Sequence, residues 1–422
     1  MSILFGVFAA GVVIGVPMAF ALGIAAAVYL SWTGLLPLSI LLQQMATSLE
    51  SWPLLAMPFF MLMGDLFMQG GMGARILNLV SALVGRLPGG LAAVCVIVNM
   101  FMAGVSGSAV ADASAIGAVL IPEMKRKGYP VEFVVALHSC SAVIGIIIPP
   151  SIPMIVYAWV TEQSVRAMFL GGVIPGIMIG ISLIVVTVWV SWREGYPREV
   201  WAGWRHFAAQ FVPNVWAFMA PVIVLGGILS GVVTATESAV LGCAYVLLVE
   251  ILIYRQLTGR QILRILASSG KMVSAALLVL ATASVYGTIL SVLRFADTLG
   301  NWMAGYLHYP LMVILAINIW YLIQGCFIDM LPGMLLTLPV FLPIAVRAGM
   351  DPIHFGVMQI IVLGIGLFTP PVGTVLFTTC AIGGTSMEKV SRQLVPFILA
   401  MVFVLVLVIL FPQLSLWLPR NV

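Results

Sequence analysis

Residues 89 to 123 form one long apolar stretch, GGLAAVCVIVNMFMAGVSGSAVADASAIGAVLIPE. As a single straight helix it would be roughly 50 Å long, well beyond the ~30 Å hydrocarbon core of a bilayer. The run Gly104-Val105-Ser106-Gly107-Ser108 interrupts it near its middle. Two half-length helices that meet at a polar turn form a re-entrant hairpin, whose tip is tolerated only inside protein or beside an aqueous cavity. We therefore predict such a hairpin at 89 to 123.

The same pattern recurs at residues 310 to 346. This stretch is also too long for one crossing, and Gly325-Cys326-Phe327-Ile328-Asp329-Met330-Leu331-Pro332 interrupts it. We predict a second re-entrant hairpin with its tip at this interruption.

The overall composition places the chain in a membrane. Of its 422 residues, 62% are apolar and only 8% are charged, too few charges to cover a soluble domain of this size. The formal net charge is +4 and its residues are scattered, so we expect the lipid bilayer, and no nucleic acid, as a partner. The predicted class is an all-α polytopic membrane protein.

Nine further segments qualify, or nearly qualify, as spans of about 20 apolar residues. They are 3 to 30, 52 to 70, 130 to 160, 168 to 192, 213 to 230, 236 to 256, 272 to 292, 352 to 385 and 394 to 418.

A cytoplasmic N-terminus and a periplasmic C-terminus give the orientation that satisfies the positive-inside rule. Four of the 18 basic residues then lie outside: Arg166, Arg294, Arg347 and Arg420. The other 14 lie in cytoplasmic loops: Arg75, Arg86, Lys125, Arg126, Lys127, Arg193, Arg198, Arg205, Arg255, Arg260, Arg264, Lys271, Lys389 and Arg392.

The chain contains an internal repeat with an offset of 221 residues. The offset aligns Pro122 with Pro343, Gly128 with Gly349, Gly145 with Gly366, Pro149 with Pro370, and Pro150 with Pro371. We predict a first repeat at 1–192, a linker and connecting span at 193–235, and a second repeat at 236–422. The connecting span is one odd crossing, so the repeats are expected to be inverted, with hairpin 89–123 opening to the cytoplasm and hairpin 310–346 to the exterior. Inverted repeats with broken helices are typical of alternating-access carriers.

The first tip and the first broken span form a candidate cation site. Proline removes a backbone donor and interrupts the helix, so carbonyls before Pro149 lose their partners within the run Gly145-Ile146-Ile147-Ile148-Pro149-Pro150-Ser151. Freed carbonyls beside the hydroxyls of Ser106 and Ser108 are hard oxygen ligands suited to sodium. The alternative is a simple proline kink with locally bonded serines.

The second tip repeats this chemistry. Thr369 supplies a hydroxyl before Pro370, and Asp329 lies in the tip. Asp329 could bind a cation, pair with a tip amide, or be hydrated near the rim; without a partner its charge would be costly at this depth. Half-helix N-termini at Ala109 and Met334 would suit a carboxylate substrate, and we interpret Asp112 as an ordinary cap in the first helical turn.

Several motifs occur together in one order. They are GVPMAFALG at 15–23, the serine-rich hairpin at 104–117, IPPSIP at 148–153, DPIHFG at 351–356 and TPPVG at 369–373. With them the chain resembles, over nearly its whole length, the large membrane subunit of tripartite ATP-independent periplasmic (TRAP) transporters.

This resemblance implies a sodium-driven importer of small organic anions in a bacterial inner membrane. Its partners would be a small four-helix membrane subunit and a periplasmic substrate-binding protein. Since the chain begins at the large-subunit motif, the small subunit is expected to be separate. By similarity, sodium ligands would fall at Ser106, Ser108, Gly145, Ile148, Pro149, Gly325, Gly366, Thr369 and Val372. For substrate contacts we expect Ser106, Gly107, Ser151, Asp329 and Thr374.

The hypothesis is an elevator-type symporter, in which the hairpins and broken spans move against a scaffold of the other spans and sodium ties each tip to its broken helix. The alternative is a stand-alone sodium–dicarboxylate carrier that needs no binding protein. An enzyme is not expected, because the sequence shows no Asp pair, no His-Glu-x-x-His pattern and no plausible Ser-His dyad.

Overall fold

The computed structural model describes residues 1–84, 89–197, 203–306 and 309–422. Within these ranges the chain is helical and contains no β-strand, which confirms the all-α class. Seven of the described helices are long and apolar enough to cross a membrane: Trp52–Gly70, Val165–Arg193, Phe207–Ser230, Ala235–Ile253, Gly259–Val292, Met330–Arg347 and Met387–Leu410. Six of them match predicted spans, and Met330–Arg347 is the second half of a predicted hairpin.

The helices before residue 200 are, in chain order, α1 (Ser2–Ile14), α2 (Met18–Thr33), α3 (Ser39–Leu49), η1 (Trp52–Leu55), α4 (Ala56–Gly70), α5 (Met72–Val84), α6 (Gly90–Ser106), α7 (Ala109–Arg126), α8 (Val131–Ala142), η2 (Val143–Ile146), α9 (Ile152–Val160) and α10 (Val165–Arg193).

The later helices are α11 (Trp204–Ser230), α12 (Ala235–Leu248), the π-helix η3 (Val249–Ile253), α13 (Gly259–Val292), α14 (Phe295–Tyr306), α15 (Pro310–Gly325), α16 (Met330–Arg347), α17 (Pro352–Leu367), α18 (Thr374–Gly383), α19 (Met387–Leu410) and α20 (Gln413–Asn421).

Both long apolar stretches are pairs of helices. α6 ends at Ser106 and α7 begins at Ala109, while α15 ends at Gly325 and α16 begins at Met330. The two helices of each pair pack against each other, so neither stretch is one continuous helix. The predicted start of the second half-helix at Met334 was four residues too late, because the tip turn is shorter than the polar run suggested.

The predicted single span at 3 to 30 is wrong, because the chain reverses between α1 and α2. Gly15 adopts a left-handed conformation with φ +85°, and the Val16 amide donates to the Gly11 carbonyl at 2.9 Å. Pro17 then starts the next helix. The two helices pack on each other, and a Cβ on Gly11 would lie 3.3 Å from that of Ala21. Residues 2–33 therefore form a short helical hairpin.

Two other span boundaries also differ. α13 starts at Gly259, earlier than the predicted 272, because its first turns are amphipathic and carry Arg260 and Arg264. The span predicted at 394 to 418 is α19, which ends at Leu410, followed by α20 beyond Pro412. The predicted cytoplasmic residues Arg86 and Arg198 lie outside the described residues.

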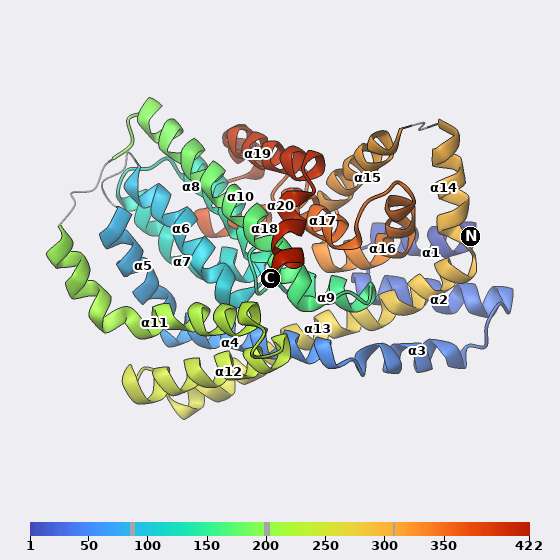
Figure 1. Ribbon diagram of the computed structural model, residues 1–422, viewed down its shortest axis with the longest axis horizontal. Helices are drawn as coiled ribbons and strands as arrows, with labels where there is room; N and C mark the ends of the chain where they lie inside the picture. The colour runs from blue at the N-terminus through green and yellow to red at the C-terminus, as the bar shows by residue number, and fades with distance from the viewer. Residues whose placement is uncertain (85–88, 198–202, 307–308) are drawn as a thin grey trace.

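The two broken helices form the centre of the protein. Every residue from Phe133 to Ile147, and every residue from His354 to Phe368, is buried. A helix that is apolar all round must be surrounded by protein or lipid, and here other helices surround it. In Figure 1, α3, α4, α11, α12 and α13 form a layer along the lower edge, whereas α6 to α10 and α15 to α20 lie above it.

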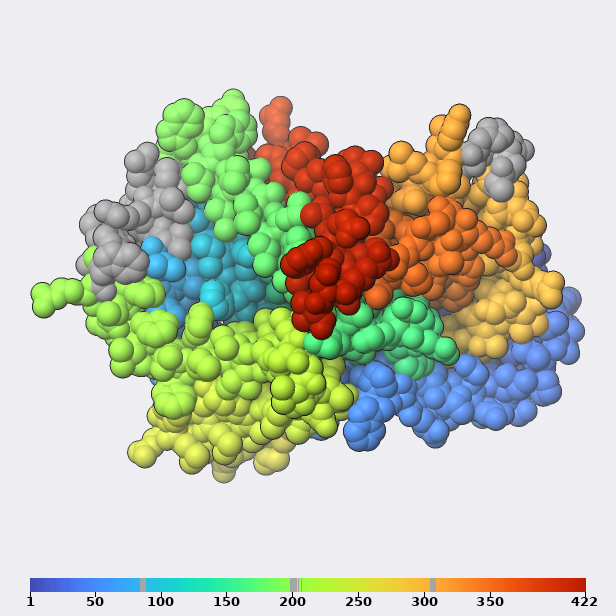
Figure 2. Space-filling model, in the orientation of Figure 1, coloured from blue at the N-terminus to red at the C-terminus, as the bar shows by residue number. Residues whose placement is uncertain are grey.

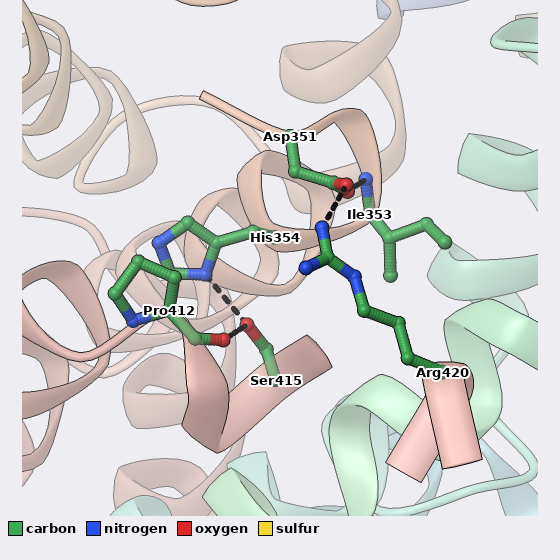
Figure 3. Close-up of polar contacts among 6 residues, drawn as sticks. All are labelled: Asp351, Ile353, His354, Pro412, Ser415 and Arg420. Atoms are coloured by element: carbon green, nitrogen blue, oxygen red, sulfur yellow. Dashed lines mark hydrogen bonds and ion pairs between the residues drawn. The ribbon is translucent and has the colours of Figure 1, made fainter. Parts of the chain in front are cut away.

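The C-terminal helix fixes the start of α17. One carboxylate oxygen of Asp351 accepts from the Ile353 amide at 2.9 Å, and the other pairs with Arg420 at 3.2 Å. His354 Nδ1 and Ser415 Oγ are 2.5 Å apart (Figure 3). Figure 2 shows the C-terminal segment, in red, on this face between the green α9–α10 region and the orange segments. α20 thus holds the N-terminal end of the second broken helix through these side-chain contacts.

We expect Asp351→Ala to lower the melting temperature of the purified protein more than Arg420→Ala does. The first variant removes a helix cap, which costs about 1 kcal/mol. The second removes only the partner of an exposed ion pair, usually worth about 0–1 kcal/mol. Thermal unfolding of both variants in detergent checks this order; an equal or larger loss for Arg420→Ala would contradict it.

Candidate functional site

The first hairpin tip is joined to the first broken helix through the backbone. The Ile152 amide, at the start of α9, donates to the Gly107 carbonyl at 3.3 Å. Gly107 has a left-handed φ of +61°, and a Cβ there would lie 2.7 Å from the Pro150 carbonyl oxygen. Only glycine therefore permits this contact.

Ser151 stabilises the same joint. Its hydroxyl donates to the Ile146 carbonyl at 2.6 Å and accepts from the Met154 amide at 3.3 Å. Ser151 is buried and caps α9, so the structure gives this predicted substrate residue a local bonding role. Pro149 and Ile148 lie in the break beside it, and Ile148 packs against Gly176 of α10.

The second tip is joined to its broken helix in the same way. The Gly373 amide donates to the Cys326 carbonyl at 3.2 Å. Beside this bond, the Thr374 hydroxyl donates to Asp329 at 3.1 Å. Asp329 and Thr374, two predicted substrate residues, are thus neighbours, although Asp329 belongs to the tip and Thr374 begins α18.

Gly325 and Gly366 bring the second tip and α17 into backbone contact. A Cβ on Gly366 would lie 2.5 Å from the Gly325 Cα, and one on Gly325 would lie 3.0 Å from the Gly366 Cα. The carbonyl oxygens of Leu367 and Thr369 both lie close to Gly373. A Cβ added to Gly373 would be 2.9 Å from the first and 3.0 Å from the second. The Thr369 hydroxyl donates a hydrogen bond to the Ile365 carbonyl at 2.6 Å, so the lone pairs of its oxygen remain available as acceptors. Val372 lies exposed in this turn. These oxygens suit an alkali cation.

Asp112 is not a helix cap, contrary to our interpretation from the sequence. Ser108 caps α7, accepting from the Ala111 amide at 3.5 Å. The Asp112 side chain is 1% exposed, and neither of its oxygens makes a hydrogen bond to the described residues. The Ser106 hydroxyl lies beside the carboxylate, but the two groups do not have the geometry of a hydrogen bond. A Cβ on Gly145 would lie 2.3 Å from one Asp112 oxygen.

A buried carboxylate without a partner is costly unless a cation neutralises it. Asp112 lies among Ser106, Ser108 and Gly145, three of the residues predicted to bind sodium. The donor set is therefore oxygen only and carries one negative charge, which fits a sodium ion.

A small cavity of about 80 Å³ lies between the two tips. The N-termini of three helices line it: Ser108 and Ala109 of α7, Ile152 of α9, and Met330 of α16. Gly107 and Asp329 also line it, whereas Ser106, Ser151 and Thr374 do not. Helix N-termini carry partial positive charge, so this cavity can hold a carboxylate group.

A further cavity of about 310 Å³ lies between α4 and the first tip. Two carboxylates line it, Asp112 and Asp65, and Ser269 of α13 hydrogen-bonds to Asp65. Sequence reasoning missed Asp65, although it is the only charged residue from 52 to 70 and such residues are usually functional in membranes. Among the described residues that line these two cavities there is no Lys, Arg or His.

Known proteins are similar to this chain over nearly its whole length. The profile of the family described as "Tripartite ATP-independent periplasmic transporter, DctM component" matches residues 5–414. The chain is 34% identical over 412 residues to the 2,3-diketo-L-gulonate TRAP transporter large permease protein YiaN of Escherichia coli, covering 98% of this chain and 97% of that protein. It is also 34% identical over 406 residues to the sialic acid TRAP transporter large permease protein SiaM of Vibrio cholerae, covering 96% and 95%.

A third relative is longer. The isethionate TRAP transporter permease protein DctMQ of Oleidesulfovibrio alaskensis is 34% identical over 418 residues, which are 99% of this chain but 66% of that protein. Because the profile covers nearly the whole chain, this protein belongs to the DctM family of TRAP transporter large permeases.

Proposed function

We propose that this chain is the large permease subunit of a sodium-coupled importer of small organic acids that moves its substrate by an elevator mechanism. The observation that carries the proposal is the pair of tip joints, Gly107 to Ile152 and Cys326 to Gly373. They meet around a cavity lined by helix N-termini. The names of relatives support organic acids as substrates, since they include a diketogulonate and a sialic acid permease.

Two inverted repeats underlie this arrangement. Helix starts separated by 221 residues support the repeat: α7 at Ala109 and α16 at Met330, and α8 at Val131 and α17 at Pro352. The offset also relates Ile152 and Gly373, the two amides of the tip joints. Broken helices related in this way are typical of carriers with a site near the membrane midplane.

The moving part comprises the hairpins and the broken helices, together with α10 and α19. Those two helices were first assigned to the scaffold, but they pack on α6, α8 and α17. The scaffold is then α1 to α4 and α11 to α13, of which α3, α4 and α11 to α13 form the lower layer of Figure 1. α5 and α14 connect the scaffold to the two hairpins.

Sodium would be held by Ser106, Ser108, Gly145, Ile148 and Pro149 on one side, with Asp112 beside them, and by Gly325, Gly366, Thr369 and Val372 on the other. A bound ion would supply the positive charge that Asp112 lacks. The chain itself holds the tips against the broken helices and points three helix N-termini at the substrate carboxylate. Its protein partners are a small membrane subunit and a periplasmic binding protein, as the DctMQ relative and the family description suggest.

The protein lies in the bacterial inner membrane, with basic loops in the cytoplasm and the C-terminus in the periplasm. The α1–α2 hairpin changes our expectation for the N-terminus. Both ends of a helical hairpin lie on the same side of the membrane. The residues after α2 lead into α4, which in the proposed topology runs from the exterior to the cytoplasm. Both ends of the α1–α2 hairpin, and with them the N-terminus, therefore lie in the periplasm. No basic residue precedes Arg75, so charge does not oppose a periplasmic N-terminus.

We expect Ser2→Cys to react in intact cells with a membrane-impermeant thiol reagent. Arg260→Cys, at the proposed cytoplasmic end of α13, is the control and should react only after lysis. Labelling gels of whole and broken cells measure both. Protection of Ser2→Cys until lysis would contradict the periplasmic N-terminus.

Uptake by proteoliposomes tests the function. The chain, reconstituted with its small subunit, should accumulate a radiolabelled organic acid only with an inward sodium gradient and the loaded binding protein. Equal uptake without the binding protein would favour the stand-alone carrier instead. Uptake without sodium would contradict ion coupling.

A further inference from the structure

His138 is fully buried in α8 and contacts both halves of the first hairpin. Its Nε2 lies 3.1 Å from the Ala113 carbonyl oxygen of α7. Its Nδ1 lies 3.4 Å from Cys95 Sγ and 3.4 Å from Asn99 Nδ2, both in α6. Because a carbonyl only accepts, Nε2 carries the proton, and Nδ1 is the acceptor for the thiol or the amide. One imidazole thus joins the first broken helix to α6 and α7.

The first hairpin is shaped around this imidazole. A Cβ on Gly117 of α7 would lie 2.8 Å from His138 Nε2, so glycine leaves the space that the ring occupies. On the other side, the buried Asn99 amide donates to the Cys95 carbonyl at 2.8 Å and to the Ser141 hydroxyl at 3.1 Å. The polar groups of three helices therefore meet around one histidine.

Gln359 occupies the equivalent position of the second broken helix, 221 residues later, and is also fully buried. Its side-chain amide donates to the Tyr321 hydroxyl of α15 at 2.9 Å. Thr337 of α16 lies beside Tyr321, and the Gln324 amide joins the two halves of this hairpin by donating to the Gly333 carbonyl at 2.7 Å. The second hairpin is thus also bonded to its broken helix by a buried polar side chain.

An asparagine recurs at the same place in both hairpins. Asn99 and Asn318 each lie seven residues before the end of their half-helix, at Ser106 and Gly325. The Asn318 amide lies 3.1 Å from the sulfur of Met358, the residue before the glutamine. Buried polar side chains are unfavourable and rare inside a membrane, so their recurrence at equivalent positions favours a shared role over accidental packing.

Both polar side chains lie close in sequence to the proposed ion sites. His138 precedes Gly145 by seven residues, and its partner Ala113 directly follows Asp112. The bond to the Ala113 carbonyl therefore fixes α7 to the same broken helix against which the Asp112 carboxylate lies. The glutamine of the second repeat precedes Gly366 by the same seven residues.

We propose that His138 and Gln359 are positioning residues for the two sodium sites. Each ties its broken helix to the hairpin of the same repeat, and so keeps the oxygen ligands of that repeat together while hairpin and broken helix move as one body. This inference rests on the proposed function, and it adds two residues that lie outside the proposed ligand sets.

Sodium binding tests the proposal without transport. The full chain is purified with its small subunit in detergent, and its melting temperature is measured against sodium chloride, with choline chloride holding the ionic strength constant. Sodium that binds only the folded state raises this temperature. His138→Leu should raise the sodium concentration for half-maximal stabilisation about fivefold, as expected for the loss of one buried hydrogen bond. Gln359→Leu should do the same.

A conservative variant and a matched control separate positioning from general stability. His138→Gln places at this position the amide that the second repeat uses, so its sodium dependence should stay within about twofold of the wild type. Ser139 is the control, because it adjoins His138 and is equally buried, but its hydroxyl lies 2.6 Å from that of Thr379 in α18. Ser139→Ala should lower the melting temperature in choline chloride and leave the sodium dependence unchanged.

Gly117→Ala is a second probe, which applies even if His138→Leu does not fold. Alanine favours the helix, but its methyl group would lie 2.8 Å from His138 Nε2 and displace the ring. It should raise the sodium requirement in the same direction. Wild-type sodium dependence in Gly117→Ala or in a folded His138→Leu would overturn the proposal, as would an equal shift in Ser139→Ala or no recovery in His138→Gln.

The same measurement distinguishes this inference from the proposed function. If sodium does not stabilise the wild-type protein, ion coupling itself fails, and the positioning role fails with it. If sodium stabilises the wild type and every variant alike, only the positioning role is overturned.

Discussion

Asp112→Asn should raise the sodium concentration needed for half-maximal uptake about 100-fold, because removing the charged partner of a buried ion costs about 3 kcal/mol. The Asp112 carboxylate is buried beside Ser106 and Gly145, and neither oxygen has a hydrogen-bond partner among the described residues. A sodium titration of uptake in proteoliposomes measures the shift. The amide has nearly the same shape, so the folded state should persist.

Asp65→Asn is the matched control for this variant. Asp65 lines the same cavity, but its carboxylate accepts a hydrogen bond from Ser269 of α13. Its loss should therefore change the sodium dependence far less. Wild-type sodium dependence in Asp112→Asn, or an equal shift in Asp65→Asn, would show that the charge at Asp112 does not serve the ion.

Gly366→Ala should abolish sodium-dependent uptake and lower the melting temperature. Its methyl group would lie 2.5 Å from the Gly325 backbone, and backbone cannot yield as a flexible side chain can. Overpacking a tight core costs about 1–3 kcal/mol, and here the strain can be relieved only by moving the second tip away from α17. Uptake and thermal unfolding are measured together on the same preparation.

Gly226→Ala is the control, since nothing lies within 4 Å of a Cβ added at Gly226 in α11. It should unfold at or above the wild-type temperature, because alanine is the better helix former. If Gly366→Ala transports like the wild type, the tip does not need its contact with α17.

The sequence predicted the hairpins because glycine, proline and serine inside an apolar run are local signals. The breaks at Gly107 and before Pro149 were visible for that reason. Gly15 and Pro17 are likewise residues that favour a turn. However, the residues on both sides of them are apolar with no polar residues between, so we predicted one span over 3 to 30.

The state of Asp112 could not be predicted from its position in the chain. Spacing alone placed it in the first turn of α7, where a carboxylate normally caps the helix. Its surroundings depend on Gly145, which comes from a different helix. A cavity of about 650 Å³ was equally hidden, since its lining combines residues of α3, α9, α13 and α16 that have no common motif.

The two tip joints are made of main-chain atoms, Gly107 to Ile152 and Cys326 to Gly373. Apart from proline, which lacks the amide N–H, every amino acid supplies the same amide and carbonyl to the backbone. Related permeases can therefore differ in the residues that line their cavities while both backbone joints are kept.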